Sequence, residues 1–153
     1  MSEENFAGNI IVNLASLPDF LRAPILRKRM IEFFSMNNSE KVEIINNALE
    51  AGPTIPFPNF SKLFKTWLEM LCTMTEENRY DMFSNYFSEI VKKPQKIILF
   101  NLDGIFEVFL NLEEINRRIL SKSIKNVVEQ LDEKSKRKMI LLTPKMARDI
   151  IGF

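Results

Sequence analysis

Three pairs of adjacent carboxylates are the residues of this chain whose types could do acid–base chemistry or hold a divalent cation. They are Glu76–Glu77, Glu113–Glu114 and Asp132–Glu133. Each pair falls where a first helical turn is expected, and the helix dipole stabilises negative charge there by about 0.3–1 kcal/mol. Neighbouring residues on a helix also point about 100° apart, so the two carboxylates of a pair do not converge on one ligand. We therefore interpret all three pairs as helix starts.

Histidine is absent from the sequence, which removes the commonest general base and the commonest metal ligand together. Catalytic triads, cysteine–histidine pairs and histidine-containing zinc sites are therefore excluded. The single cysteine, Cys72, cannot form an intramolecular disulfide and fits a reducing compartment. We predict a protein that is not an enzyme, with no catalytic residue, no metal site and no cofactor.

One string, IILFNLDGIF at residues 97–106, resembles the first motif of the haloacid-dehalogenase phosphatases, an apolar strand followed by Asp-x-Asp-Gly-Thr. In that family the first Asp is the nucleophile and helps to bind magnesium. Asn101 stands at that position here, and an amide cannot attack as a carboxylate does; Ile105 replaces the Thr. We predict a buried helix that breaks near Asp103 and Gly104, because a lone strand has no partner in this chain.

Charge is distributed unevenly along the chain, although the net charge is only +1. Residues 1–114 carry 11 Lys and Arg against 16 Asp and Glu, whereas residues 115–153 carry 10 against 4. Helical spacing gathers six basic residues of the last third into one basic ridge, namely Arg118, Lys122, Lys125, Lys134, Arg137 and Lys138. Such a ridge attracts phosphate backbones, anionic membranes or acidic proteins, and it equally fits a solvated face.

Phenylalanine and methionine are abundant, with 13 Phe and 8 Met, and most of them recur at helical spacing. A cavity for an apolar ligand or a peptide groove would use such residues, but core packing explains them more simply. Phe64 and Trp67 lie on one predicted stripe, and Phe83 and Phe87 lie on the next. We expect these four rings to be buried together in an antiparallel helical hairpin.

Helical periodicity and capping residues define the expected elements. Asn37 with Glu40 and Asn111 with Glu114 have capping-box spacing, Asn59 caps the clearest helix, and Pro24 opens another. The segment between Gly52 and Phe60, with three prolines, is expected to be a rigid extended connector. The helices are expected at residues 6–17, 24–35, 37–52, 59–71, 75–93, 111–131, 132–142 and 143–151.

Internal similarity supports a recurring helix pair. A shift of 38 residues places Val42 on Tyr80 and Ile45 on Phe83, and a shift of 37 places Phe83 on Leu120 and Phe87 on Ile124. The period is close to the roughly 34–47 residues of helical solenoids. Amphipathic helices joined by similar loops also align in this way by chance, so stacked helix pairs and an irregular bundle both remain open.

The C-terminal stretch carries a second resemblance, through Leu131, Asp132, Arg137, Pro144 and Ala147, followed by Ile150. These residues match a pattern of leucine, acidic cap, basic helix and Pro-x-x-Ala helix. The pattern resembles the short-helix superhelical repeats of the magnesium-transporter N-terminal domain and the flagellar motor switch protein. The resemblance covers less than a fifth of the chain and concerns capping and core positions, so it implies architecture and not function.

The sequence therefore predicts a single helical domain over residues 1–153. It is expected to be all-α, with helical hairpins stacked as a short irregular superhelix or bundle, HEAT-like or similar, of about 7–9 helices. The acidic N-terminal residues Glu3 and Glu4 do not fit a secretory signal, and no apolar run is long enough to span a membrane, so a cytoplasmic location is expected.

We predict a non-catalytic interaction module that binds a protein partner. A nucleic-acid-binding or regulatory protein that uses the basic last third is the first alternative, and a helical bundle that binds an apolar ligand is the second. Self-association of the chain is compatible with each of these three functions.

Overall fold

The computed structural model describes residues 6–153, all of them in helices, turns or loops without a strand. The all-α prediction is therefore confirmed. Glu3 and Glu4, on which the argument against a secretory signal rests, lie outside the described residues. Within residues 6–153, no helix is both long enough and apolar enough to cross a bilayer.

Ten α-helices and one 3₁₀ turn follow one another along the described chain. This is one helix more than the upper end of the predicted range, and the short helix α6 has only four residues. The elements are α1 (Phe6–Ser16), α2 (Asp19–Phe34), α3 (Asn38–Ala51), η1 (Gly52–Thr54), α4 (Phe57–Cys72), α5 (Glu76–Lys92), α6 (Pro94–Ile97), α7 (Leu102–Leu110), α8 (Glu114–Glu129), α9 (Glu133–Leu142) and α10 (Lys145–Ile151).

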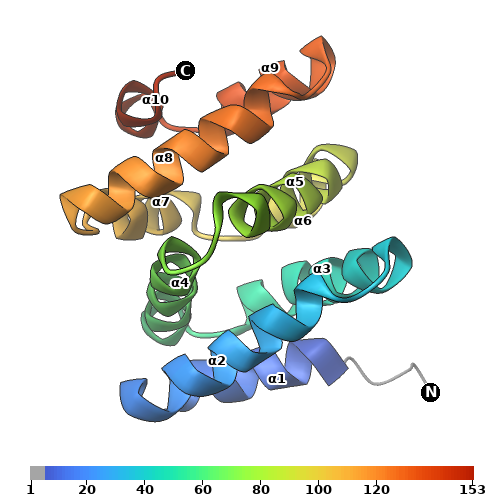
Figure 1. The fold of residues 1–153 in the computed structure, drawn as a ribbon, viewed down its shortest axis with the longest axis vertical. Coiled ribbons are helices and arrows are strands. Elements are labelled where there is room, and N and C mark those ends of the chain that lie inside the picture. The colour runs from blue at the N-terminus through green and yellow to red at the C-terminus, as the bar shows by residue number, and fades with distance from the viewer. Residues whose placement is uncertain (1–5) are drawn as a thin grey trace.

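The helices stack along the longest axis of the molecule, from α1 and α2 at one end to α9 and α10 at the other (Figure 1). They form two rows, because most helices pack against the next but one in the chain. One row contains α1, α3, α5 and α8, and the other contains α2, α4 and α7. The apolar core lies between and along these rows.

Helix starts recur at a fixed spacing. The N-cap residues Pro18, Asn37, Pro56 and Thr75 are 19 residues apart, and Glu113 follows Thr75 after twice that interval. The second half of this double interval, after α5, contains α6 and α7 where the other intervals contain one longer helix. A shift of 38 residues therefore also relates α5 to α8, and the shift of 37 that aligned their apolar residues is one residue too short.

Arginines join three of these helices, α2, α5 and α8, each to the one before it. Arg22, Arg79 and Arg117 all stand four residues after an N-cap, and their guanidinium groups donate hydrogen bonds to backbone carbonyls five residues earlier, those of Leu17, Met74 and Leu112. Arg79 and Arg117 also bond the carbonyls of Leu71 and Leu110. Each arginine thus bonds carbonyl groups at the end of the preceding helix, where helix carbonyls have no intrahelical partner.

Side-chain hydrogen bonds between distant parts of the chain have a narrow range of separation. Every such bond among the described residues that joins positions more than eight apart joins positions 40–50 apart. Lys41 and Asp81, which form an ion pair at 2.8 Å, illustrate this separation between α3 and α5. The range matches the distance along the chain between neighbouring helices of one row.

Three predicted helix starts are wrong. Pro24 lies inside α2, which begins at Asp19 and continues through the proline. Asn59 lies in the first turn of α4, whose N-cap is Pro56. Asn111 is the C-cap of α7 and does not start α8. The predicted extended connector is correspondingly short, because η1 occupies residues 52–54 and α4 begins at residue 57.

The predicted break in the segment 97–110 lies earlier than expected. The chain leaves the helix after Ile97 and starts α7 at Leu102, so Asp103 and Gly104 belong to the first turn of α7. Asn101 sets this start, because its side-chain oxygen accepts a hydrogen bond from the Gly104 backbone N–H at 3.0 Å. The residue at the position of the phosphatase nucleophile is therefore a helix cap, and no strand precedes it.

Candidate functional site

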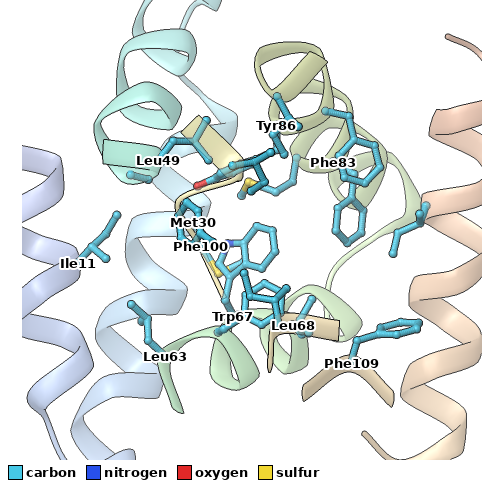
Figure 2. A pocket seen from close by; sticks show the side chains of 18 of the residues that line it. Ile11, Met30, Leu49, Leu63, Trp67, Leu68, Phe83, Tyr86, Phe100 and Phe109 are labelled. Atoms are coloured by element: carbon cyan, nitrogen blue, oxygen red, sulfur yellow. The ribbon is translucent and has the colours of Figure 1, made fainter. Parts of the chain in front are cut away.

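An apolar cavity of about 410 Å³ lies between the two rows of helices. Each of the ten α-helices contributes at least one side chain to its wall. Ile11, Leu49 and Phe109, which come from α1, α3 and α7, show how far apart in the chain the wall residues lie (Figure 2). Protein interiors rarely leave voids much larger than a water molecule, so this space is unusual for a packed core.

Aromatic rings from α4 and α5 form the centre of the wall. Phe64 stacks on Trp67 at 5.8 Å between ring centroids, Trp67 meets the edge of Phe83 at 5.9 Å, and Phe83 contacts Phe87 at 5.7 Å. The expected cluster of four rings is thus present. All four rings line the cavity; Phe83 is buried as expected, whereas the other three are only partly buried.

The break between α6 and α7 brings further aromatic surface to the cavity. Phe100, in the turn after α6, lies 5.4 Å from Phe60 between ring centroids and lines the cavity. Its ring packs over Gly52, where a Cβ atom would come within 2.3 Å of it. Glycine at this position therefore lets the ring approach the backbone of η1.

Polar groups are scarce in the cavity wall. Arg29 and Glu32 form an ion pair of 3.3 Å between exposed side chains on α2, and the Thr143 hydroxyl donates to the Met139 carbonyl at 2.7 Å. The remaining two polar side chains of the wall are Trp67 and Tyr86, whose rings contact each other at 5.4 Å. Burial raises the pKa of Tyr86 to about 12, so its hydroxyl stays protonated at neutral pH.

No family model, curated protein or solved structure matches this chain. The cavity therefore has to be interpreted from its own residues.

The sequence contained a signal for this cavity in its many Phe and Met residues, which were assigned to the core. Within residues 6–153, no group of three or more Cys, Asp or Glu side chains is placed to hold a metal ion. In the sequence, a cavity for an apolar ligand was only an alternative to core packing.

The six residues of the basic ridge lie on α8 and α9, and they do not share one environment. Arg118 pairs with Glu114 at 2.6 Å, Lys138 donates to the Val91 carbonyl at 3.3 Å, and the Lys125 side chain lies beside Gly152. Four members are exposed and make no ion pair within the described chain, namely Lys122, Lys125, Lys134 and Arg137.

The adjacent carboxylates lie at helix starts, as predicted, and one of them has a further contact. Burial tends to raise the pKa of Glu76, but hydrogen bonds from Ser123, Arg79 and Asn126 outweigh it, and the pKa is lowered. The bonds from Ser123 and Asn126 tie α5 to α8, and the bond from Arg79 lies within α5. Asp132 accepts from the backbone N–H of Ser135, which lowers its pKa and caps α9.

Two more groups, Cys72 and Glu89, belong to the packing and not to a reactive site. Burial raises the pKa of Cys72 to about 11, so the thiol is not a nucleophile at neutral pH. Glu89 is buried on α5, where desolvation opposes its ionisation, but hydrogen bonds from Asn46 and Lys92 lower its pKa below the ordinary value. The bond from Asn46 connects α3 to α5 at 2.9 Å.

Proposed function

We propose that this protein binds a small apolar molecule in the cavity between its two rows of helices. The observation that carries the proposal is the size and lining of that cavity, about 410 Å³ within apolar walls. Ligand sites for small molecules typically measure about 300–1,000 Å³ and are lined mainly by hydrophobic and aromatic side chains. Apolar walls of this kind favour apolar molecules over water.

Energetics support the proposal. Side chains that border an empty space lose dispersion contacts, so the cavity lowers the stability of the unliganded protein. A bound apolar ligand restores those contacts and removes its own surface from water. Because it binds only the folded state, it also raises the melting temperature as its concentration increases. The proposed activity is binding without chemistry, in keeping with a sequence that has no histidine.

Filling the cavity should abolish ligand binding. Ala48 on α3 lines the cavity, and we expect Ala48→Phe to remove binding of an uncharged fluorescent probe such as N-phenyl-1-naphthylamine by occupying its space. Binding is followed by probe emission and by the emission of Trp67, the only tryptophan of the chain. Ala23→Phe on α2, outside the cavity wall, is the matched control and should bind as the unmodified protein does.

Melting curves of both variants establish that they are folded. Failure of the unmodified protein to bind any uncharged apolar probe, or equal binding by the Ala48→Phe variant, would refute the proposed function.

A second candidate function is the binding of an acidic protein partner in the cytoplasm. The observation that favours it is a group of exposed apolar side chains near the basic ridge, since Leu141 is 82% and Met146 is 69% exposed. Leu141 lies on α9 and Met146 lies on α10, at the end of the stack that carries the ridge (Figure 1). A partner with acidic and apolar residues would complement this surface.

Charge reversal tests this second candidate. We expect Arg118→Glu with Lys122→Glu to weaken capture of an acidic partner in a pull-down, chiefly through slower association, and to leave the melting temperature unchanged. The double variant Lys62→Glu with Lys65→Glu, on α4, is the control. Binding of labelled DNA or RNA that falls steeply with salt would favour nucleic acid instead, and self-association lost on charge reversal would favour a second copy of the chain.

A further inference from the structure

Two hydrogen-bond donors face the apolar cavity without a partner. Tyr86 extends from α5 and Trp67 from α4, and Figure 2 shows both side chains reaching into the space between the rows. Neither the Tyr86 hydroxyl nor the Trp67 indole N–H makes a hydrogen bond to any residue of 6–153. Neither of these two atoms is among the fully buried unpaired polar atoms of the described chain, which are Ser121 Oγ and Arg148 Nε, so both donors are free to bond a molecule that enters the cavity.

The rings that carry the two donors are in contact, so both side chains lie in the same part of the cavity wall. Their rings meet edge to face with centroids 5.4 Å apart. An indole N–H can only donate, and a tyrosine hydroxyl can donate as well as accept. An oxygen with two lone pairs, such as a ketone, ester or alcohol oxygen, can accept from both at once.

A charged ligand group does not suit this position. Arg29 and Glu32 are the only charged side chains in the described wall, and they are exposed and paired with each other. A carboxylate placed beside Tyr86 would lose its hydration without gaining a cation, which costs far more than two neutral hydrogen bonds return.

We infer that the ligand is an uncharged apolar molecule that carries one hydrogen-bond-accepting oxygen, which Tyr86 and Trp67 bind together. The inference rests on the proposed function, because it names the chemical class of the molecule that the cavity takes. Apolar walls provide most of the affinity, and the pair of donors selects oxygen-bearing molecules over hydrocarbons of the same shape.

Three compounds of similar size test the inference: butylbenzene, 4-phenyl-2-butanone and 3-phenylpropanoate. In calorimetric titrations the ketone should bind more tightly than the hydrocarbon, and the carboxylate most weakly. Tyr86→Phe keeps the ring and should weaken ketone binding by about 2- to 12-fold, the equivalent of one net hydrogen bond, without weakening hydrocarbon binding. Tyr80→Phe is the control, since Tyr80 is the only other tyrosine and does not line the cavity.

The outcomes separate the two proposals. If none of the three compounds and no uncharged probe binds, both the proposed function and the inference fail. If the hydrocarbon binds as tightly as the ketone, or Tyr86→Phe and Tyr80→Phe behave alike, the function stands and the inference is overturned. Tightest binding of the carboxylate would overturn it as well.

Discussion

Phe83→Ala is expected to lower the free energy of unfolding by about 3–5 kcal/mol. Phe83 is only 3% exposed and contacts Trp67 and Phe87, so its removal deletes one ring contact between α4 and α5 and another within α5. The loss should be large because the neighbouring space is already unfilled and offers little that could collapse into the new void.

Chemical denaturation followed by circular dichroism measures this effect. Phe20, which is 75% exposed on α2, provides the control, because its replacement by alanine should change stability by no more than about 0.5 kcal/mol. An unfolding midpoint that Phe83→Ala leaves in place would mean that the aromatic cluster is not the centre of the core.

Arg79→Met is expected to lower the free energy of unfolding by about 3 kcal/mol or more. The guanidinium donates to the carbonyls of Leu71 and Met74, to the Ser123 hydroxyl and to Glu76, and its side chain is 12% exposed. Methionine replaces the apolar part of the side chain but none of these donors. Hydrogen bonds from a charged donor contribute about 1.5–3 kcal/mol each, and the loss is smaller at Leu71 and Glu76, which keep other partners.

Arg118→Met is the matched control for this prediction. Arg118 is 78% exposed and pairs only with Glu114, so its loss should cost no more than about 0.5 kcal/mol. Equal effects of the two substitutions in thermal unfolding would mean that the junction between α4 and α5 does not depend on its arginine.

Part of the fold follows from local sequence rules. Thr75 and Asp132 were recognised as helix starts, because a short polar side chain precedes acidic residues and an amphipathic stripe. The same rules failed for Asn111 and Asn59. Asparagine also suits helix C-caps and tolerates a first turn, so its type alone does not say which end of a helix it marks.

The regular spacing of the helices was predicted only in part from the sequence. Apolar residues were compared between helix pairs, which found the shift of 38 but gave 37 for the next pair. The helix starts, Pro18, Asn37, Pro56 and Thr75, have a more regular spacing than the apolar residues. Their chemistry differs from one helix to the next, and the division into α6 and α7 interrupts the series.

Residue types hinted at a cavity through the many Phe and Met residues, but they could not predict its size or place. Helical stripes of Phe, Leu and Met show which side chains turn inwards, but they do not show whether those side chains fill the space between the helices. That volume depends on where the chain turns between Ile97 and Leu102, and the turn was expected near Asp103. Tyr86 was assigned no role, since a single tyrosine on an apolar stripe is ordinary in a core.

The narrow range of hydrogen-bond separations has a consequence for how the chain folds and opens. Bonds that span 40–50 residues require the closure of only moderate loops, and no side-chain hydrogen bond among the described residues joins the two ends of the stack. Folding can therefore begin at any pair of neighbouring helices and spread to the next, as in chains whose units contact only their neighbours. The terminal helices can detach while the centre stays folded. Backbone amides of α9 and α10 should then exchange with solvent through partial openings that leave α4 and α5 protected.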